Sequence, residues 1–420
     1  MDVEGCPVYL AEDTRPLCIV DTANRLLTSA ARIRWERLFC RWLHQDQRGF
    51  LPGRSMLANV VDLEHYSMMC SLLHKRPAAF LFDFAAAFPS LSQDFLLDML
   101  KLLPIPRHVA RLARSFYVGH RGCPTLEGQH GDMFELSAGI RQGCPLSPLL
   151  FVVVVDGLLR CMQRESPDTY ARMYADDTAI VVQNVQVQVP QIQKIFKLIG
   201  EAAHLRLNIQ KCVHIPLFLP SEEDPVLLLT QTAPEYANMK CDTKGTYLGF
   251  VAGLGKGHLA WDKALAKAEE RVRLWQWCEL GLFFASQTWN TFITSIVGFV
   301  AQLESPPPHL APTVAKLLRK AAHGCGNWCR AADIHNLRRA FQFPGEFRHI
   351  GWMAKAAMFR TSTYENVKQG GLQITARDQE LREAYRHTVF SSAAGSGTLG
   401  MSAQRWCRCR PGVGTSGSLA

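Results

Sequence analysis

The spacing of hydrophobic positions alternates between extended and helical patterns through the first part of the chain. Residues 80–84 form a short apolar run that holds one carboxylate, and helical spacing begins after Pro89, which predicts a strand followed by a helix. Residues 173–182 contain two β-rich arms around a pair of aspartates, which predicts a hairpin. Strands that alternate with helices across residues 80–250 predict an α/β module.

Helical spacing also appears outside these segments. It predicts helices within three further stretches, namely residues 13–43, 149–159 and 190–204. A further strand is expected after a turn at Asn208. From Gly257 to about Leu303 the spacing is again helical, so we expect a second, all-helical module to begin near residue 256. The Gly- and Ser-rich end of the chain predicts disorder from about residue 395.

Composition narrows the class of protein. With 420 residues, 48% hydrophobic and 20% charged, the chain is long and apolar enough for a substantial core, which excludes a disordered or collagen-like chain. Fourteen cysteines show no repeating framework, and the start lacks the basic and apolar regions of a signal peptide. An intracellular protein with reduced thiols is expected. The apolar stretch Leu282–Leu303 contains several amides and hydroxyls, so we expect no membrane span.

Charge is unevenly distributed. The net charge is +9, with a mildly acidic middle and a basic C-terminal half. This distribution suits a protein that holds cations centrally and binds a phosphate backbone at its flank, although many intracellular proteins are equally basic.

Three carboxylates are the strongest candidates for chemistry. Asp83 ends an apolar strand, and Asp176 and Asp177 lie at the tip of the expected hairpin between apolar arms. Adjacent acids in such surroundings are costly unless cations neutralise them, and their hard oxygen ligands favour Mg²⁺ or Mn²⁺. If the strands are neighbours, the carboxylates converge on a site for phosphoryl or nucleotidyl transfer. The alternative is a solvated Asp-Asp turn and an unrelated acid at a strand end.

Five motifs occur in a fixed order along the same part of the chain. They are FLFDFAAAF at 80–88, GIRQGCPLSPLLF at 139–151, MYADDTAIVV at 173–182, LRLNIQKC at 205–212 and YLG at 247–249. Together they resemble the palm motifs of reverse transcriptases, most closely those of non-LTR (LINE-like) retrotransposons. Upstream, residues 15–38 and 49–60 resemble the fingers motifs of that branch.

The resemblance implies a fold, an activity and partners. It implies an α/β (α+β palm) right-hand polymerase fold, with fingers and palm in residues 1–250, an all-helical thumb in 256–345 and an extension in 346–420. It further implies RNA-directed DNA synthesis with two Mg²⁺ ions, or Mn²⁺, on an RNA template from a DNA primer and deoxynucleoside triphosphates. A nuclear location follows from how similar elements insert.

The resemblance also assigns roles to the catalytic positions. Asp83, Asp176 and Asp177 match the metal-binding, catalytic aspartates of the family, and Lys211 matches a lysine that assists the leaving pyrophosphate. Phe88 stands where the family places the aromatic gate against a ribose 2′-hydroxyl, which argues against an RNA-dependent RNA polymerase. The plain alternatives are a solvated lysine and a core phenylalanine.

Other matched positions contact nucleotide, primer or template in the family. The nucleotide-binding candidates are Arg141, Gln142 and Gly143 before an expected helix, with Arg15 and Arg25 in the fingers motif. The primer and template candidates are Tyr247, Leu248, Gly249 and Arg54. A basic stripe in the expected thumb could follow a duplex backbone or could simply be solvated; it consists of Lys256, Lys263, Lys267, Arg271 and Arg273.

The sequence departs from the family pattern in two respects. Pro89 stands where many relatives carry Asp, which is expected to reshape the turn from strand to helix. The short stretch before the first fingers motif leaves no room for an endonuclease domain, so we expect a polymerase core cut from a longer element. A catalytically inactive nucleic-acid-binding remnant of such an element is the alternative function. Oligomeric state and priming mode stay open.

Overall fold

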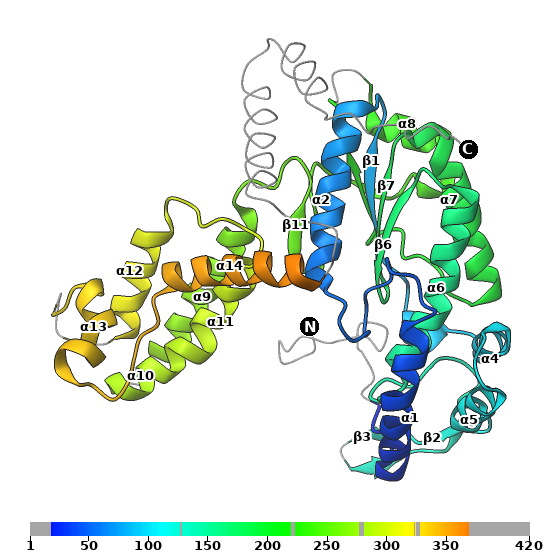
Figure 1. The fold of residues 1–420 in the computed structure, drawn as a ribbon, viewed down its shortest axis with the longest axis horizontal. Coiled ribbons are helices and arrows are strands. Elements are labelled where there is room, and N and C mark those ends of the chain that lie inside the picture. The colour runs from blue at the N-terminus through cyan, green and yellow to red at the C-terminus, as the bar shows by residue number, and fades with distance from the viewer. Residues whose placement is uncertain are drawn as a thin grey trace, which may run out of the picture. The chain divides into compact units, whose positions relative to one another are not determined.

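The structure is a computed structural model that describes residues 18–126, 128–219, 223–276, 281–322, 324 and 328–368 (Figure 1). The chain divides into two compact units, Met1–Gly253 and Leu254–Ala420. Arg15 and the expected disordered tail lie outside the described residues.

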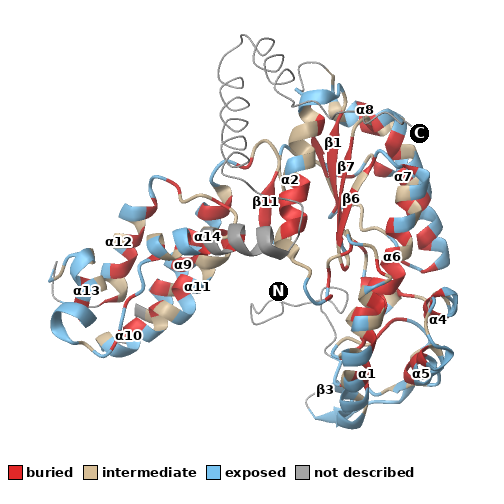
Figure 2. Ribbon diagram, in the orientation of Figure 1, coloured by how far each residue is buried: buried red, intermediate tan, exposed pale blue. Residues whose placement is uncertain are grey.

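A five-stranded sheet forms the centre of the first unit. Its strand order is β6-β7-β1-β8-β9, and β1 pairs antiparallel with both β7 and β8. The strands are β1 (Ala78–Phe82), β6 (Tyr170–Tyr174), β7 (Asp177–Val182), β8 (Val213–Pro216) and β9 (Lys240–Cys241). All five residues of β1 are buried, as expected for a strand covered on both faces (Figure 2).

Helices cover both faces of this sheet. Phe80 and Phe82 of β1 join one large apolar core with α6 (Ser147–Glu165) and α7 (Val185–Ala202). Helix α2 (Met56–Leu73) contacts β1, β6 and β7 and lies on the other side of the sheet in Figure 1. Residues 149–155 of α6 are all apolar and all buried, whereas the second half of the helix places Asp156, Arg160 and Gln163 on one polar face.

The other elements of the first unit are short or lie at its periphery. The helices are α1 (Thr22–Cys40), α3 (Ala87–Ser90), α4 (Gln93–Leu102), α5 (Arg107–Tyr117), α8 (Pro225–Thr232) and the 3₁₀ turn η2 (Pro234–Tyr236). Three two-stranded ribbons pair β2 (Arg121–Gly122) with β5 (Phe134–Glu135), β3 (Thr125–Leu126) with β4 (Gln129–His130), and β10 (Gly245–Tyr247) with β11 (Phe250–Ala252).

The described residues of the second unit form helices and their connections. These are α9 (Leu259–Gln276), α10 (Leu282–Thr288), the π-helical η3 (Trp289–Ile293), α11 (Thr294–Val300), α12 (Leu310–Ala321), α13 (Ala331–Phe341) and α14 (Ile350–Lys368). Trp261 and Trp289 are fully buried in its core. The Nζ atom of Lys256 lies 3.0 Å from Glu304 in a buried ion pair, which removes Lys256 from the expected basic stripe.

The predicted fold class is confirmed, and the element boundaries differ for local reasons. Helix α1 begins only at Thr22, because the carboxylate of Asp21 accepts hydrogen bonds from the first free backbone N–H groups. Helix α7 starts at Val185 and not at 190, because the side chain of Asn184 caps it, and Pro190 lies inside the helix. No helix in the described part of the chain has the length and apolar character that a membrane span requires.

Candidate active site

The pairing of β1 with β7 brings the predicted carboxylates to one end of the sheet. Phe82, the last residue of β1, is paired with Thr178 of the antiparallel strand β7, so Asp83, which follows Phe82, and Asp177, which precedes Thr178, lie at the same end of the sheet. Asp177 is itself paired with Tyr174 across the hairpin, and Asp176 occupies the two-residue turn between β6 and β7. Three acids from two distant sequence segments therefore lie at the same end of the sheet.

These acids influence one another electrostatically. Desolvation by neighbouring protein atoms, followed by the charges of Asp176 and Asp83, raises the pKa of Asp177 to about 6. Asp177, the first residue of β7, is nevertheless exposed to solvent. Within the described ranges, no three His, Cys, Asp or Glu side chains are arranged as a complete metal-binding set. The site thus combines strong negative charge with access to solvent.

The hairpin turn adopts an unusual backbone conformation. Ala175 has a φ of +57°, in the left-handed region that residues with a Cβ rarely adopt, and it is almost fully buried. Its N–H group donates a 3.1 Å hydrogen bond to Oε1 of Gln47. The turn is therefore held by a side chain that lies far away in the sequence.

Residues 44–49 run beside β6 and contact its backbone. The N–H of Met173 donates to the carbonyl of Asp46 at 3.1 Å, and the N–H of Arg48 donates to the carbonyl of Met173 at 2.9 Å. These two bonds form a short parallel bridge between Gln47 and Met173. Residues 44–49 thereby form a third extended segment beside the two strands of the hairpin, close to its turn.

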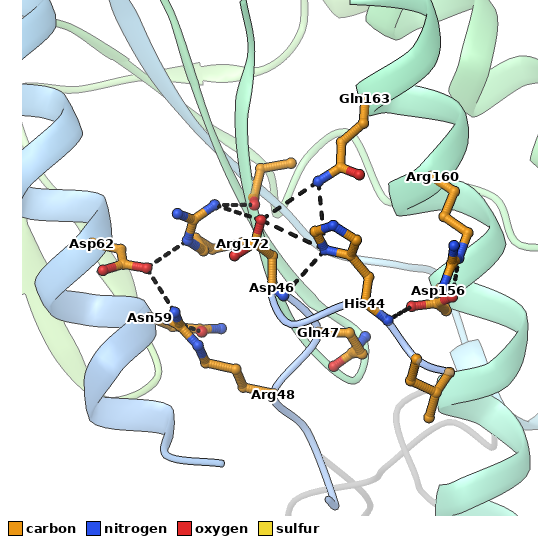
Figure 3. A network of polar contacts seen from close by, with 12 residues as sticks. His44, Asp46, Gln47, Arg48, Asn59, Asp62, Asp156, Arg160, Gln163 and Arg172 are labelled. Carbon is orange, nitrogen blue, oxygen red and sulfur yellow. Dashed lines mark hydrogen bonds and ion pairs between the residues drawn. The ribbon is translucent and has the colours of Figure 1, made fainter. Parts of the chain in front are cut away.

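A network of charged side chains anchors this segment (Figure 3). Arg172 of β6 donates to Asp62 of α2 at 2.6 Å and lies 3.1 Å from Asp46. Arg48 lies 2.9 Å from the same Asp62. Because both arginines share one carboxylate that is almost fully buried, the loop, α2 and β6 are tied together.

The network continues from the loop to α6. The N–H of His44 donates to Asp156 at 2.7 Å, and Arg160 lies 2.7 Å from the same carboxylate. Gln163 lies within hydrogen-bonding distance of His44, at 3.4 Å (Figure 3). Residues 44–49 are therefore fixed from two sides, by α2 and by α6.

Phe88 lies in the short helix α3 after the left-handed residue Ala86. Its ring stacks on that of Phe151 with 4.7 Å between the centroids, and the side chain is half-buried. Pro89 is part of α3, so the strand-to-helix connection includes a helical turn of its own. One face of the Phe88 ring is therefore covered by the core, and its role as a gate against a ribose 2′-hydroxyl stays a prediction.

Arg141, Gln142 and Gly143 precede α6. The guanidinium of Arg141 donates to the carbonyl of Phe116 and lies 5.4 Å from the centre of the Tyr117 ring, which ties it to α5. Gly143 has a φ of +82°, and a Cβ there would lie 2.8 Å from the carbonyl oxygen of Cys18. Glycine is therefore required at this position by conformation and by space.

Leu248 and Gly249, both with positive φ, form the turn between β10 and β11, directly after Tyr247 at the end of β10. The hydroxyl of Tyr247 accepts a 3.1 Å hydrogen bond from Asn59 and donates one of 3.2 Å to the carbonyl of Arg172. Burial raises the pKa of this tyrosine. The turn is thus connected to the strand that leads to the aspartates.

The remaining candidates have different surroundings. The guanidinium of Arg54 donates to the backbone carbonyls of Cys40, Leu43, His44 and Gln47. Its hydrogen-bonding capacity is largely used within residues 40–47, and its template role stays a prediction. Lys211 and Arg25 are exposed, the first on the turn after Asn208 and the second on α1.

Sequence reasoning missed the residues that position the hairpin. Gln47, Arg48, Asp62 and Arg172 carry no motif that separates them from ordinary surface polar residues. One signal was present, because Arg172 interrupts an otherwise apolar strand before the aspartates and needs a buried partner there.

Comparisons with known proteins agree with the motif analysis. The sequence model of the family described as "Reverse transcriptase (RNA-dependent DNA polymerase)" matches residues 10–252. The chain is 27% identical over 254 residues to the retrovirus-related Pol polyprotein from type-2 retrotransposable element R2DM of Drosophila melanogaster, a match that covers 57% of this chain and 23% of that protein. It is 24% identical over 166 residues to the corresponding polyprotein from type-1 retrotransposable element R2 of Popillia japonica, which covers 38% of this chain and 27% of that protein.

A third relative is the transposon TX1 uncharacterized 149 kDa protein of Xenopus laevis, 24% identical over 216 residues, with 48% of this chain and 16% of that protein covered. The matched region covers 27% or less of the length of each of these three relatives. Among solved structures, apo telomerase from Candida tropicalis has 12% identity and a TM-score of 0.42, with 87% of this chain and 61% of that chain covered.

Proposed function

Because the chain belongs to the reverse transcriptase (RNA-dependent DNA polymerase) family, with relatives in non-LTR retrotransposons, we propose that it is an RNA-directed DNA polymerase. In this proposal it extends the 3′-hydroxyl of a DNA primer with deoxynucleoside triphosphates on an RNA template. The meeting of Asp83 with Asp176 and Asp177 at one end of the sheet carries the proposal. A cluster of carboxylates is the arrangement that nucleotidyl transfer at divalent cations requires.

Asp83, Asp176 and Asp177 would hold two Mg²⁺ ions, or Mn²⁺ in their place. The residues fit such ions, because their oxygen atoms are hard ligands and because a cation would offset the desolvation and the repulsion that together raise the pKa of Asp177. When bound, the ions would neutralise the reacting phosphates and align the attacking and leaving oxygens.

The other predicted residues supply binding and selection. Phe88, braced by Phe151, is proposed to exclude a ribose 2′-hydroxyl by its bulk. Lys211 is exposed and can approach the leaving pyrophosphate, either as a proton donor or as a positive charge. Gln142 and Gly143 are proposed to contact the nucleotide from the turn before α6, together with Arg141, Arg15 and Arg25.

The primer and template are proposed to lie along elements that flank the carboxylates. Tyr247, Leu248 and Gly249 would form the primer grip. Arg54 would support the template indirectly, through residues 40–47, whose backbone carbonyls it binds. In the second unit, α9 exposes Lys263, Lys267 and Arg273, which suit sequence-independent contacts to a duplex backbone.

Primer extension with purified protein on an RNA template and a DNA primer tests the proposal. We expect incorporation of deoxynucleotides that depends on Mg²⁺ or Mn²⁺ and is lost in the Asp176→Ala/Asp177→Ala variant. Equal extension by that variant would reject the assigned site. Salt-sensitive binding to an RNA–DNA duplex without incorporation would instead identify a catalytically inactive nucleic-acid-binding remnant, which the net charge of +9 also suits.

A further inference from the structure

We propose that Gln47 is a positioning residue for the carboxylates of Asp176 and Asp177. Its side-chain amide holds the hairpin turn in the conformation that directs these two groups toward Asp83. This inference rests on the proposed polymerase function, because it assigns to Gln47 a part in presenting the catalytic aspartates. Gln47 itself touches neither nucleotide nor metal in this proposal.

The first support is the hydrogen bonding of the Gln47 side chain. Its Oε1 atom accepts from the N–H of Ala175 at 3.1 Å and from the N–H of Gly49 at 2.9 Å. Gln47 is fully buried, so water cannot take over either bond if the side chain is shortened. One oxygen atom thus joins the loop of residues 44–49 to Ala175, the residue directly before Asp176.

The second support is the conformation that this bond stabilises. Ala175 has a φ of +57°, which costs free energy for a residue with a Cβ and persists only where the surroundings enforce it. Gly49 packs so closely that a Cβ at this position would overlap the amide nitrogen of Ala175. The loop therefore holds the turn both by hydrogen bonding and by direct backbone contact.

The third support is the rigidity of the loop itself. Asp46 is paired with Arg172, and Arg48 is paired with Asp62, so charged partners hold the residues on both sides of Gln47 (Figure 3). Because the loop is anchored to α2 and β6, Gln47 is a fixed acceptor and not a side chain that follows the turn. A fixed acceptor is what preorganisation of the adjacent carboxylates requires.

The same hairpin offers a matched control at its open end. Gln188 is also almost fully buried, and its Oε1 accepts from the N–H groups of Gln183 and Asn184, at 2.7 and 2.9 Å. These residues follow β7 directly, at the end away from the aspartates. Gln47 and Gln188 therefore each accept two backbone N–H bonds, at opposite ends of one hairpin, and Gln188 also donates to Oγ1 of Thr169 at 3.2 Å.

The experiment compares Gln47→Met with Gln188→Met, since methionine keeps the length of the side chain and removes the acceptor. Both variants are expected to lower the melting temperature. Only Gln47→Met is expected to lower kcat, about tenfold or more, with little change in the KM for deoxynucleotides, and to raise the Mg²⁺ concentration needed for half-maximal rate. Gln47→Asn, one methylene shorter, replaces Gln47→Met if the latter does not fold.

Two further readouts need no catalysis. Binding of Mn²⁺ alone, followed by electron paramagnetic resonance, should weaken in Gln47→Met and stay unchanged in Gln188→Met. Amide hydrogen exchange should accelerate at residues 174–177 in the first variant and at 183–184 in the second. If the wild type shows no incorporation, the proposed function fails, and these two readouts still decide the role of Gln47. Equal kinetics, Mn²⁺ binding and exchange at the turn in the two variants would overturn the positioning role.

Discussion

Asp83 directly follows β1 and Asp177 begins the neighbouring antiparallel strand β7, and the charge of Asp83 contributes to the raised pKa of Asp177, about 6. This pair is held together by the paired residues Phe82 and Thr178 and not by any attraction between the acids. The fold therefore maintains a repulsive arrangement, which is typical of sites that are built to receive a cation.

Asp83→Asn should separate activity from stability. The amide removes a metal ligand, so we expect incorporation to fall by at least about a thousandfold, equivalent to about 4 kcal/mol in the barrier. It also removes one of the charges that repel Asp177, so the melting temperature should stay level or rise. Single-nucleotide extension and thermal unfolding measure the two effects. A variant that unfolds at a clearly lower temperature would point to a structural role for Asp83.

Phe88→Ala should gain the use of ribonucleotides. Removal of the ring opens the space that a 2′-hydroxyl would need, so the preference for deoxynucleotides should fall by about tenfold or more. The loss of the stack on Phe151 should also lower stability. Competing extension with each nucleotide type measures the preference. Phe88→Tyr keeps the stack and the bulk and serves as the control; a relaxed preference in this variant too would argue against a gate.

Much of the site could be predicted from local patterns. Asp83 after an apolar run and Asp176–Asp177 between β-rich arms indicate strand ends, and the ordered motifs indicate that these ends belong to one sheet. The confirmed fold class follows from the same alternation of strands and helices. Such features depend on residues that are close in sequence, where spacing and composition carry the information.

The support around the site depends on pairs that no local pattern reveals. Gln47 and Ala175 are separated by 128 positions, and Arg172 and Asp62 by 110. Their meeting requires the register of the sheet and the course of residues 44–49 to be fixed first. Arg54 has the same difficulty, because its four backbone acceptors exist only once the loop is folded.

Gly49→Ala should disturb the turn between β6 and β7 that carries Asp176, because Gly49 packs against this turn. The added Cβ would meet backbone atoms of Tyr174 and Ala175, which cannot rotate away as a side chain could, so we expect a loss of about 2 kcal/mol or more in the free energy of unfolding. Denaturant unfolding measures it. In Gly298→Ala of α11 the Cβ would meet no heavy atom within 4 Å, and this control should be neutral or stabilising. A fully stable Gly49→Ala protein would contradict the close packing of loop and turn.

His214 of β8 is buried against Phe80, with 4.9 Å between the ring centroids, and neither of its ring nitrogens has a hydrogen-bond partner among the described residues. Burial lowers the pKa of this histidine to about 4. The unfolded chain therefore takes up a proton near pH 6.5, whereas the folded protein resists it until about pH 4.

The stability of the first unit should fall as the pH decreases from about 6.5 to 4, by about 3 kcal/mol from His214 alone. His214→Phe keeps an aromatic ring against Phe80 and cannot be protonated, so this part of the slope should disappear. Asp177, whose pKa is raised, contributes a slope of opposite sign, but it is present in both proteins and cancels in their difference. Denaturant unfolding of both proteins at several pH values measures that difference. Parallel curves would mean that His214 is protonated as readily in the folded protein as in the unfolded chain.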